Sequence, residues 1–220
     1  MRNRIICDSS SLISLSMNCM LPLIVELSEV ADFIITKTVR DEIIDKPKRM
    51  GQHMMAPLYF TALVKCGVLK VEEADEKKVA GILDLSNSMY YARHHALTII
   101  QRGEAEALAL ASEGGTLLID ERTLRFMIET PKDLMSLLQF RMHRDVTMNE
   151  EKRKLFQKYC ENISIIRSSE IVAVAYEKGI LGKYFEGERR EVLEACLYSL
   201  KSRGCSLSMD DIDDYLRMLG

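Results

Sequence analysis

The 220-residue sequence contains no uninterrupted apolar run of about 18 residues, so we expect no membrane-spanning helix. Glycine and proline, 11 and 4 residues, are too few for a fibrous or disordered chain. The first eight residues turn acidic too early for a secretory signal. The formal net charge of −3 excludes a protein that coats nucleic acid through an overall positive charge. It does not exclude a nucleic-acid enzyme, because local patches set the field.

Several cofactor and catalytic motifs are also missing. The six cysteines form no CxxC pair, and no histidine stands at zinc-finger spacing. We therefore expect free thiols in a reduced, cytoplasmic protein. Asp8-Ser9-Ser10-Ser11 stands where a dinucleotide-binding protein would have GxGxxG, and neither GxxxxGK[ST] nor GxSxG occurs. These absences disfavour a Rossmann nucleotide binder, a P-loop protein and a serine hydrolase.

Short apolar runs alternate with amphipathic segments along most of the chain. We predict strands at 4–7, 33–36, 68–71, 116–119 and 163–166. Helices are predicted at 22–31, 57–64, 75–86, 92–102, 103–111, 169–178, 188–201 and 209–219, with a further helix capped by Thr38 and a loop over 46–51. Strands separated by helices pair in parallel, so we predict an α/β fold: a three-layer α/β/α sandwich around about five parallel strands.

The domain organisation predicted from this pattern is simple. Residues 1–220 form a single domain, with a helical insertion at 129–161 and a C-terminal helical extension at 180–220. The insertion is inferred because the fifth strand is separated from the fourth by an unusually long, polar and mostly helical stretch.

Acidic residues stand where strands end or where the adjoining helices begin. These are Asp8, Glu42, Glu104 and Asp120. Ligands of an open parallel sheet bind outside the carboxyl ends of the strands, so the four carboxylates converge if the first and fourth strands are neighbours. Gathered carboxylates suit Mg²⁺ or Mn²⁺. Taken singly, each acid also fits a helix cap or a solvated helix position.

These segments resemble the PIN-domain nuclease family. The similarity is carried by Ile5-Ile6-Cys7-Asp8-Ser9-Ser10-Ser11-Leu12-Ile13, Thr38-Val39-Arg40-Asp41-Glu42-Ile43, Gly103-Glu104-Ala105-Glu106-Ala107-Leu108-Ala109-Leu110-Ala111 and Leu117-Leu118-Ile119-Asp120-Glu121-Arg122. The last two look most similar to one PIN subgroup, in which a tail like Gly179-Ile180-Leu181 through Arg203-Gly204 is familiar. The resemblance covers about residues 3–128 and resumes near 162–219.

The resemblance implies an Mg²⁺- or Mn²⁺-dependent ribonuclease, either the toxin of a toxin–antitoxin pair or an RNA-processing enzyme. Carried over by position, Asp8, Glu42, Glu104 and Asp120 form the catalytic, metal-binding quartet. The third acid of the family is commonly Asp, and its separation from the fourth is short here, so Glu106 or Glu121 could share either role.

The partners inferred at this stage are RNA, an antitoxin protein and a second copy of the chain. Residues expected to hold substrate are Ser9, Lys46, Lys48, Arg49, Arg122 and Arg125, with Arg141, His143 and Arg144 as further candidates. The alternative hypothesis is a catalytically inactive PIN-fold module that binds RNA or protein, because a Glu replaces an Asp and an insertion interrupts the pattern. Metal binding separates the two hypotheses.

Overall fold

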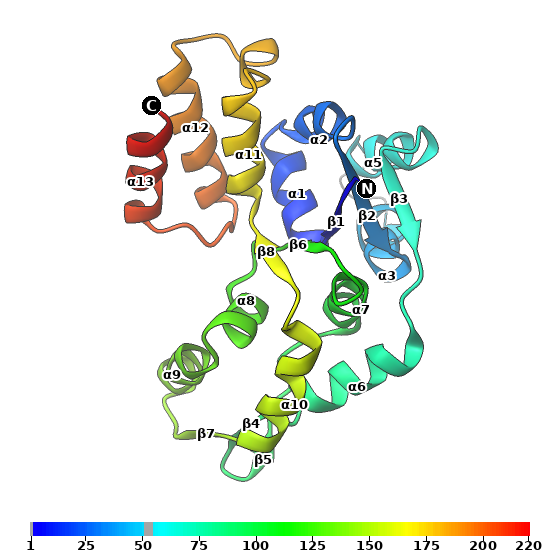
Figure 1. Ribbon diagram of the computed structural model, residues 1–220, viewed down its shortest axis with the longest axis vertical. Coiled ribbons are helices and arrows are strands. Elements are labelled where there is room, and N and C mark those ends of the chain that lie inside the picture. The colour runs from blue at the N-terminus through cyan, green and yellow to red at the C-terminus, as the bar shows by residue number, and fades with distance from the viewer. Residues whose placement is uncertain (1, 51–54) are drawn as a thin grey trace.

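The computed structural model describes residues 2–50 and 55–220. Its centre is a five-stranded sheet in the order β3-β2-β1-β6-β8. The strands are β1 (Asn3–Cys7), β2 (Ala31–Thr36), β3 (Leu69–Glu72), β6 (Thr116–Leu118) and β8 (Ser164–Ile166). All four neighbouring pairs are parallel. The predicted strands and fold class are confirmed (Figure 1).

Two hydrophobic clusters cover the two faces of this sheet. One contains buried residues of α1 (Ser9–Met17), α2 (Leu21–Leu27), α5 (Met55–Lys65), α11 (Ser168–Glu177), α12 (Arg189–Ser202) and α13 (Met209–Leu219). The other contains those of α6 (Glu76–Ser86), α7 (Arg102–Ala111), α8 (Arg122–Glu129), α9 (Pro131–Met142) and α10 (Glu150–Cys160). Within β1, Ile6 belongs to the second cluster and Cys7 to the first, as the alternation of a strand requires.

The segment that follows β2 is helical and contains a π turn. It runs through α3 (Lys37–Arg40), a π-helical turn η1 (Asp41–Asp45) and α4 (Lys46–Met50). The predicted helix start is wrong by two residues, because the Thr36 hydroxyl, not that of Thr38, accepts the Val39 N–H at 3.2 Å. The loop predicted over 46–51 is also wrong over Lys46–Met50, while Gly51 lies outside the described residues.

A second, three-stranded antiparallel sheet replaces the helix predicted at 92–102. It consists of β4 (Tyr90–Ala92), β5 (His95–Ala96) and β7 (Val146–Met148), in the order β5-β4-β7. The chain turns sharply between β4 and β5, and β4 pairs with a strand more than 50 positions away. A pattern that reads only local periodicity cannot detect such pairing. A short 3₁₀ turn, η2 (Leu181–Lys183), completes the described elements.

Within the described residues, no single helix is long and apolar enough to cross a membrane. Helices α1 and α2 reach the required length and composition only when taken together, and they meet at an angle of 114°.

Candidate active site

The site is built where the order of the sheet reverses, between β1 and β6. Asp8 follows β1 and caps α1. Its Oδ2 accepts the Ser10 N–H at 3.0 Å and the Ser10 hydroxyl at 2.6 Å. These bonds fix the orientation of a carboxylate that is only 6% exposed. The two interpretations of Asp8, helix cap and site residue, are therefore compatible.

Glu42 reaches the same edge from the π-helical turn that follows β2 and α3. That turn is closed by a hydrogen bond from Lys46 N–H to the carbonyl of Asp41, five residues earlier. Such π turns occur often at functional sites. Across from it, Gly103 opens α7. A Cβ placed on Gly103 would lie 3.5 Å from Glu42 Oε1, so the absence of a side chain there keeps the space beside the carboxylate open.

Two further glutamates face this space from helix N-termini. In a capping box of α7, Glu104 accepts the Gln101 N–H at 2.8 Å. Glu121 caps α8 by accepting the N–H groups of Thr123 and Leu124 at 2.6 and 3.0 Å. Both carboxylates are thus positioned by backbone amides at a helix start, where negative charge is favoured.

These four acids line one pocket of about 230 Å³. Its lining consists of Asp8, Ser9, Ser10, Glu42, Gln101, Gly103, Glu104 and Glu121. None of these eight residues is basic, so no side chain in the lining neutralises the carboxylates. Asp8, Glu42 and Glu104 are brought together as the sequence predicted, and the fourth acid in the pocket is Glu121.

Burial and mutual repulsion raise the pKa values of two of the acids, Glu104 and Asp8. Burial raises the pKa of Glu104 to about 7. The hydrogen bond from the Gln101 N–H lowers this pKa, while the charges of Asp8, Glu121 and Glu42 raise it further. Burial also raises the pKa of Asp8, opposed by its hydrogen bonds to Ser10 and assisted by Glu121. Such raised carboxyl pKa values in a cleft are typical of functional sites.

The donor chemistry of this pocket fits a hard divalent cation, since carboxylate oxygens are the preferred ligands of Mg²⁺ and Mn²⁺. Among the described residues, no three acidic, histidine or cysteine side chains form a group that already encloses one ion. Holding a cation therefore requires the longer side chains of Glu42, Glu104 and Glu121 to turn toward Asp8.

Asp120 lies outside this pocket. It is 2% exposed, and its two oxygens accept hydrogen bonds from Ser168. The reason is strand alternation: Leu118 packs in the cluster around α1 and α11, Ile119 packs in the opposite cluster, and Asp120 returns to the α11 side. Its predicted place among the converging carboxylates is therefore taken by the neighbouring Glu121.

Glu106 does not line the pocket either. Its Oε1 accepts a hydrogen bond from Arg102 Nε at 2.8 Å, and its Oε2 accepts the Thr38 N–H at 3.4 Å. Because it is 7% exposed and already paired, Glu106 joins α7 to the start of α3. Of the two glutamates in the Gly-Glu-Ala-Glu motif, only Glu104 faces the pocket.

The residues proposed to hold substrate differ in their distance from the pocket and in how far their side chains are already engaged. Ser9 lines the pocket, and Lys46 is exposed on α4. Lys48 donates to the Thr61 hydroxyl, and Arg49 pairs with Asp41 at 3.0 Å.

Arg122 and Arg125 both donate to the Ser206 hydroxyl at 3.2 Å. The Arg125 side chain is 15% exposed and also pairs with Glu129, so its guanidinium is engaged within the protein.

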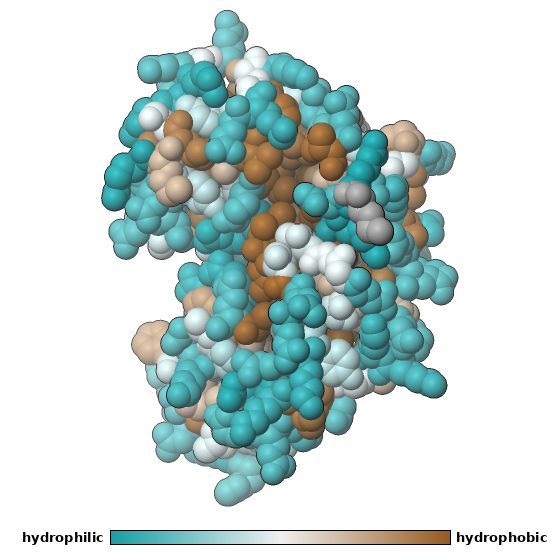
Figure 2. Space-filling view, viewed as in Figure 1, coloured by the Kyte–Doolittle hydropathy of each residue, from teal (hydrophilic) through white to brown (hydrophobic). Residues whose placement is uncertain are grey.

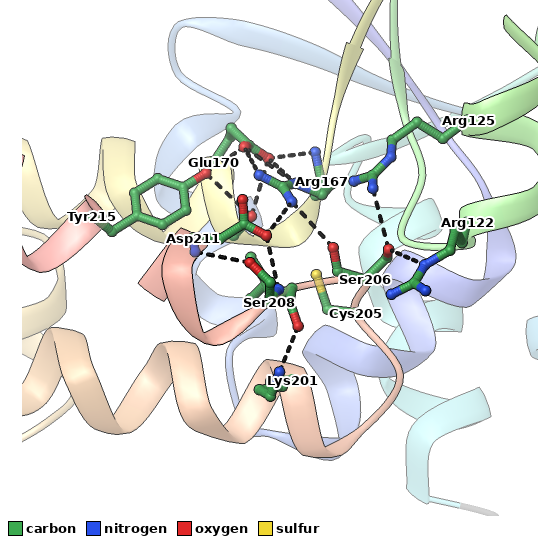
Figure 3. Close-up of polar contacts among 12 residues, drawn as sticks. Arg122, Arg125, Arg167, Glu170, Lys201, Cys205, Ser206, Ser208, Asp211 and Tyr215 are labelled. Atoms are coloured by element: carbon green, nitrogen blue, oxygen red, sulfur yellow. Dashed lines mark hydrogen bonds and ion pairs between the residues drawn. The ribbon is translucent and has the colours of Figure 1, made fainter. Parts of the chain in front are cut away.

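A polar network around Arg167 joins α13 and the loop before it to the start of α11 (Figure 3). Arg167 pairs with Glu170 and Asp211 and donates to the carbonyl of Ser206 at 3.1 Å. Tyr215 donates to Glu170 from α13. This network fixes α13 and the loop before it against the end of β8 and the start of α11. Sequence patterns give no sign of it because its members are far apart in the chain.

Ser10, Gln101 and Gly103 are the pocket residues that sequence patterns do not single out as functional. Their signal was present: Gln101 stands three positions before Glu104, the spacing of a capping box. The sequence places Gly103 only within the motif that opens a helix.

An open parallel α/β/α sheet with a carboxylate-lined pocket at its switch point defines the class of fold and site. A family model described as a PIN domain matches residues 4–130, more than half of the chain. The chain therefore belongs to the PIN domain family, whose fold is of the nuclease type. The match identifies the family and does not select a toxin subgroup. No curated protein and no solved structure matches the chain.

Proposed function

We propose that this protein is an Mg²⁺- or Mn²⁺-dependent endoribonuclease that hydrolyses RNA phosphodiester bonds. The observation that carries the proposal is the set of four carboxylates around one pocket with no basic residue in its lining. When bound, a divalent cation would lower the pKa of an attacking water and neutralise charge on the scissile phosphate. Asp8, Glu42, Glu104 and Glu121 would hold the cation. Asp120 would support the site by anchoring the segment before Glu121 to Ser168.

The remaining pocket residues have binding and positioning roles in this proposal. The hydroxyl of Ser9 and the side-chain amide of Gln101 line the pocket and offer donors to phosphate oxygens. Ser10 holds Asp8 through two hydrogen bonds, and the Gln101 N–H holds Glu104. Lys46 and Arg122, near the pocket in sequence, remain proposed contacts to the RNA backbone.

The test compares cleavage of end-labelled single-stranded RNA, hairpin RNA and single-stranded DNA by the purified protein with Mg²⁺ or Mn²⁺. Glu104→Gln and Glu121→Gln preserve size and remove the charge, and both should abolish cleavage. Glu113→Gln is the matched control, because it removes a carboxylate from an exposed pair with Lys78 just beyond the C-terminal end of α7. Cleavage by wild type and by Glu104→Gln at equal rates would refute the proposal.

The inactive-module alternative is separated by metal binding. Isothermal titration should show Mn²⁺ bound by wild type and weakened by Glu104→Gln. Absence of divalent-ion binding at millimolar concentration, together with intact RNA binding, would favour the module over the nuclease.

A toxin role under control of an antitoxin is a further proposal, supported by one observation. An apolar hollow of about 780 Å³, lined by residues that include Ile13, Met17, Tyr59 and Phe60, shares Glu42 with the acidic pocket. A protein segment seated there would lie beside the cleavage site. Expression of wild type should then arrest growth while Glu104→Gln does not. The homodimer also remains a proposal, and light scattering at micromolar concentration would test it.

A further inference from the structure

A second pocket of about 660 Å³ lies in the small antiparallel sheet, away from the acidic site. It is lined by Tyr91, Arg93, His94, His143, Arg144, Asp145 and Thr147. Two turns form it: the β4–β5 hairpin and the segment between α9 and β7. The pairing of β4 with β7, with Tyr91 opposite Thr147, holds the two turns side by side. Figure 1 places this sheet at the end of the molecule opposite α1 and α2.

This pocket is positively charged in a chain whose net charge is negative. It contains two arginines and two histidines against the single acid Asp145. The ion pairs of the described residues engage other arginines, such as Arg102, Arg153 and Arg167, and none engages Arg93 or Arg144. All four basic side chains are exposed, and hydrophilic residues cover this end of the molecule (Figure 2). The two arginine charges and the histidine ring nitrogens are therefore available to a ligand.

The backbone under these side chains is strained. Arg93 and His94 have φ values of 48° and 68°, and His143 has a φ of 49°. They are three of the four non-glycine residues with positive φ in the described part of the chain. A two-residue hairpin loop with positive φ at both positions normally contains Asn or Gly, which adopt it at lower cost. Arg and His thus stand where their backbone conformation is unfavourable, and strain of this kind concentrates at functional sites.

We infer that this basic pocket binds the phosphate backbone of RNA and serves the nuclease as a second grip on a long substrate. Arginine and histidine donors are suited to phosphate oxygens, and contacts to phosphate position a nucleic acid without reading its sequence. Tyr91 adds an aromatic ring to the lining, on which an unpaired base can stack. The inference rests on the proposed function for its substrate but uses none of the residues of the acidic pocket.

The test measures RNA binding without cleavage. Arg93→Ala/Arg144→Ala keeps an L-residue at position 93, so the backbone strain is unchanged. Lys178→Ala/Arg217→Ala removes the same charge from the C-cap of α11 and from α13 and is the matched control. In EDTA, the first pair should weaken binding of a long single-stranded RNA about tenfold and lower the slope of log K against log salt by about 1 to 1.5. The control pair should change neither.

Four results would overturn the inference. One is an unchanged RNA affinity and salt slope in Arg93→Ala/Arg144→Ala. The second is equal loss in the control pair, which would indicate a general charge effect. The third is a loss of inorganic phosphate binding in Arg93→Ala/Arg144→Ala, monitored through the histidine ring signals in NMR, while RNA binding is unaffected. This would make the pocket a site for the free anion. The fourth is weaker binding of an acidic peptide by Arg93→Ala/Arg144→Ala with RNA binding unaffected, which would reject RNA as the ligand.

Two further measurements keep this inference separate from the proposed function. If RNA binding depends on Arg93 and Arg144 but no metal permits cleavage, the inference stands and the nuclease proposal fails. Arg93→Gly relieves the positive φ, so we expect a higher melting temperature together with weaker RNA binding. A variant that is more stable and binds RNA as wild type does would show that Arg93 has no role in binding.

Discussion

Asp120 accepts two hydrogen bonds from Ser168, one from its backbone N–H and one from its hydroxyl, each 2.7 Å long. Cys205 Sγ lies 3.3 Å from the same carboxylate. The acid at the end of β6 therefore ties β6 to the start of α11 and to the loop before α13. Its position in sequence is that of a site residue, while its contacts are those of a structural anchor.

Asp120→Ala should destabilise the protein by about 2 to 4 kcal/mol, because it leaves the buried Ser168 donors without their charged acceptor. Urea denaturation gives the free energy of unfolding. Ser168→Ala alone should cost less, and the double variant should cost less than the two single changes together, since the two residues share one interaction. A fully stable Asp120→Ala that has lost only activity would instead place Asp120 in the catalytic site.

The pKa of Glu104 predicts how the metal-free protein responds to pH. The value is about 7 in the folded protein against an ordinary 4.5, so folding favours the protonated form. Below about pH 4.5 Glu104 is protonated in both the folded and the unfolded state, so its contribution to the free energy of unfolding is fully present. As pH rises toward 7, the unfolded state releases the proton first, and the free energy of unfolding falls.

Glu104→Gln removes this dependence. The variant should be more stable than wild type at about pH 8 in EDTA, by roughly 1 to 3 kcal/mol, and should lose the advantage near pH 5. Saturating Mn²⁺ should stabilise wild type and not the variant. Thermal unfolding across this pH range is the measurement, and an identical pH profile for the two proteins would contradict the raised pKa.

The sequence predicted the sheet well because its strands are short apolar runs ended by polar residues, as at Ile5-Ile6-Cys7-Asp8. It placed Asp8, Glu42 and Glu104 at one edge for the same reason. Asp120 and Glu121 could not be separated from sequence, because a shift of one residue after a strand reverses the side toward which the chain points. The Arg93-His94 turn was missed because its residues are poor turn formers and β4 pairs mainly with distant β7.

The two glutamates of the Gly-Glu-Ala-Glu motif should differ sharply in function. Glu104→Gln should reduce the cleavage rate by at least about 100-fold without loss of stability, since its carboxylate faces the pocket. Glu106→Gln should mainly reduce stability, by about 1 kcal/mol, because it weakens a contact between the nearly buried Glu106 carboxylate and the half-exposed Arg102. Rate measurements well below the melting temperature of each variant separate the effects, and the opposite ranking would exchange the two roles.

Gly103 offers a test of how closely α7 approaches Glu42. A methyl group at this position would make ordinary contacts, 3.4 Å from Thr38 Cγ2 and 3.5 Å from Glu42 Oε1. Gly103→Ala should therefore fold and gain up to about 1 kcal/mol from higher helix propensity. Gly103→Leu places a larger apolar group beside the carboxylate, so Mn²⁺ affinity measured by titration should fall at least about tenfold while α7 still forms. Equal Mn²⁺ affinity in both variants would mean that the cation is held away from Glu42, toward Asp8 and Glu121.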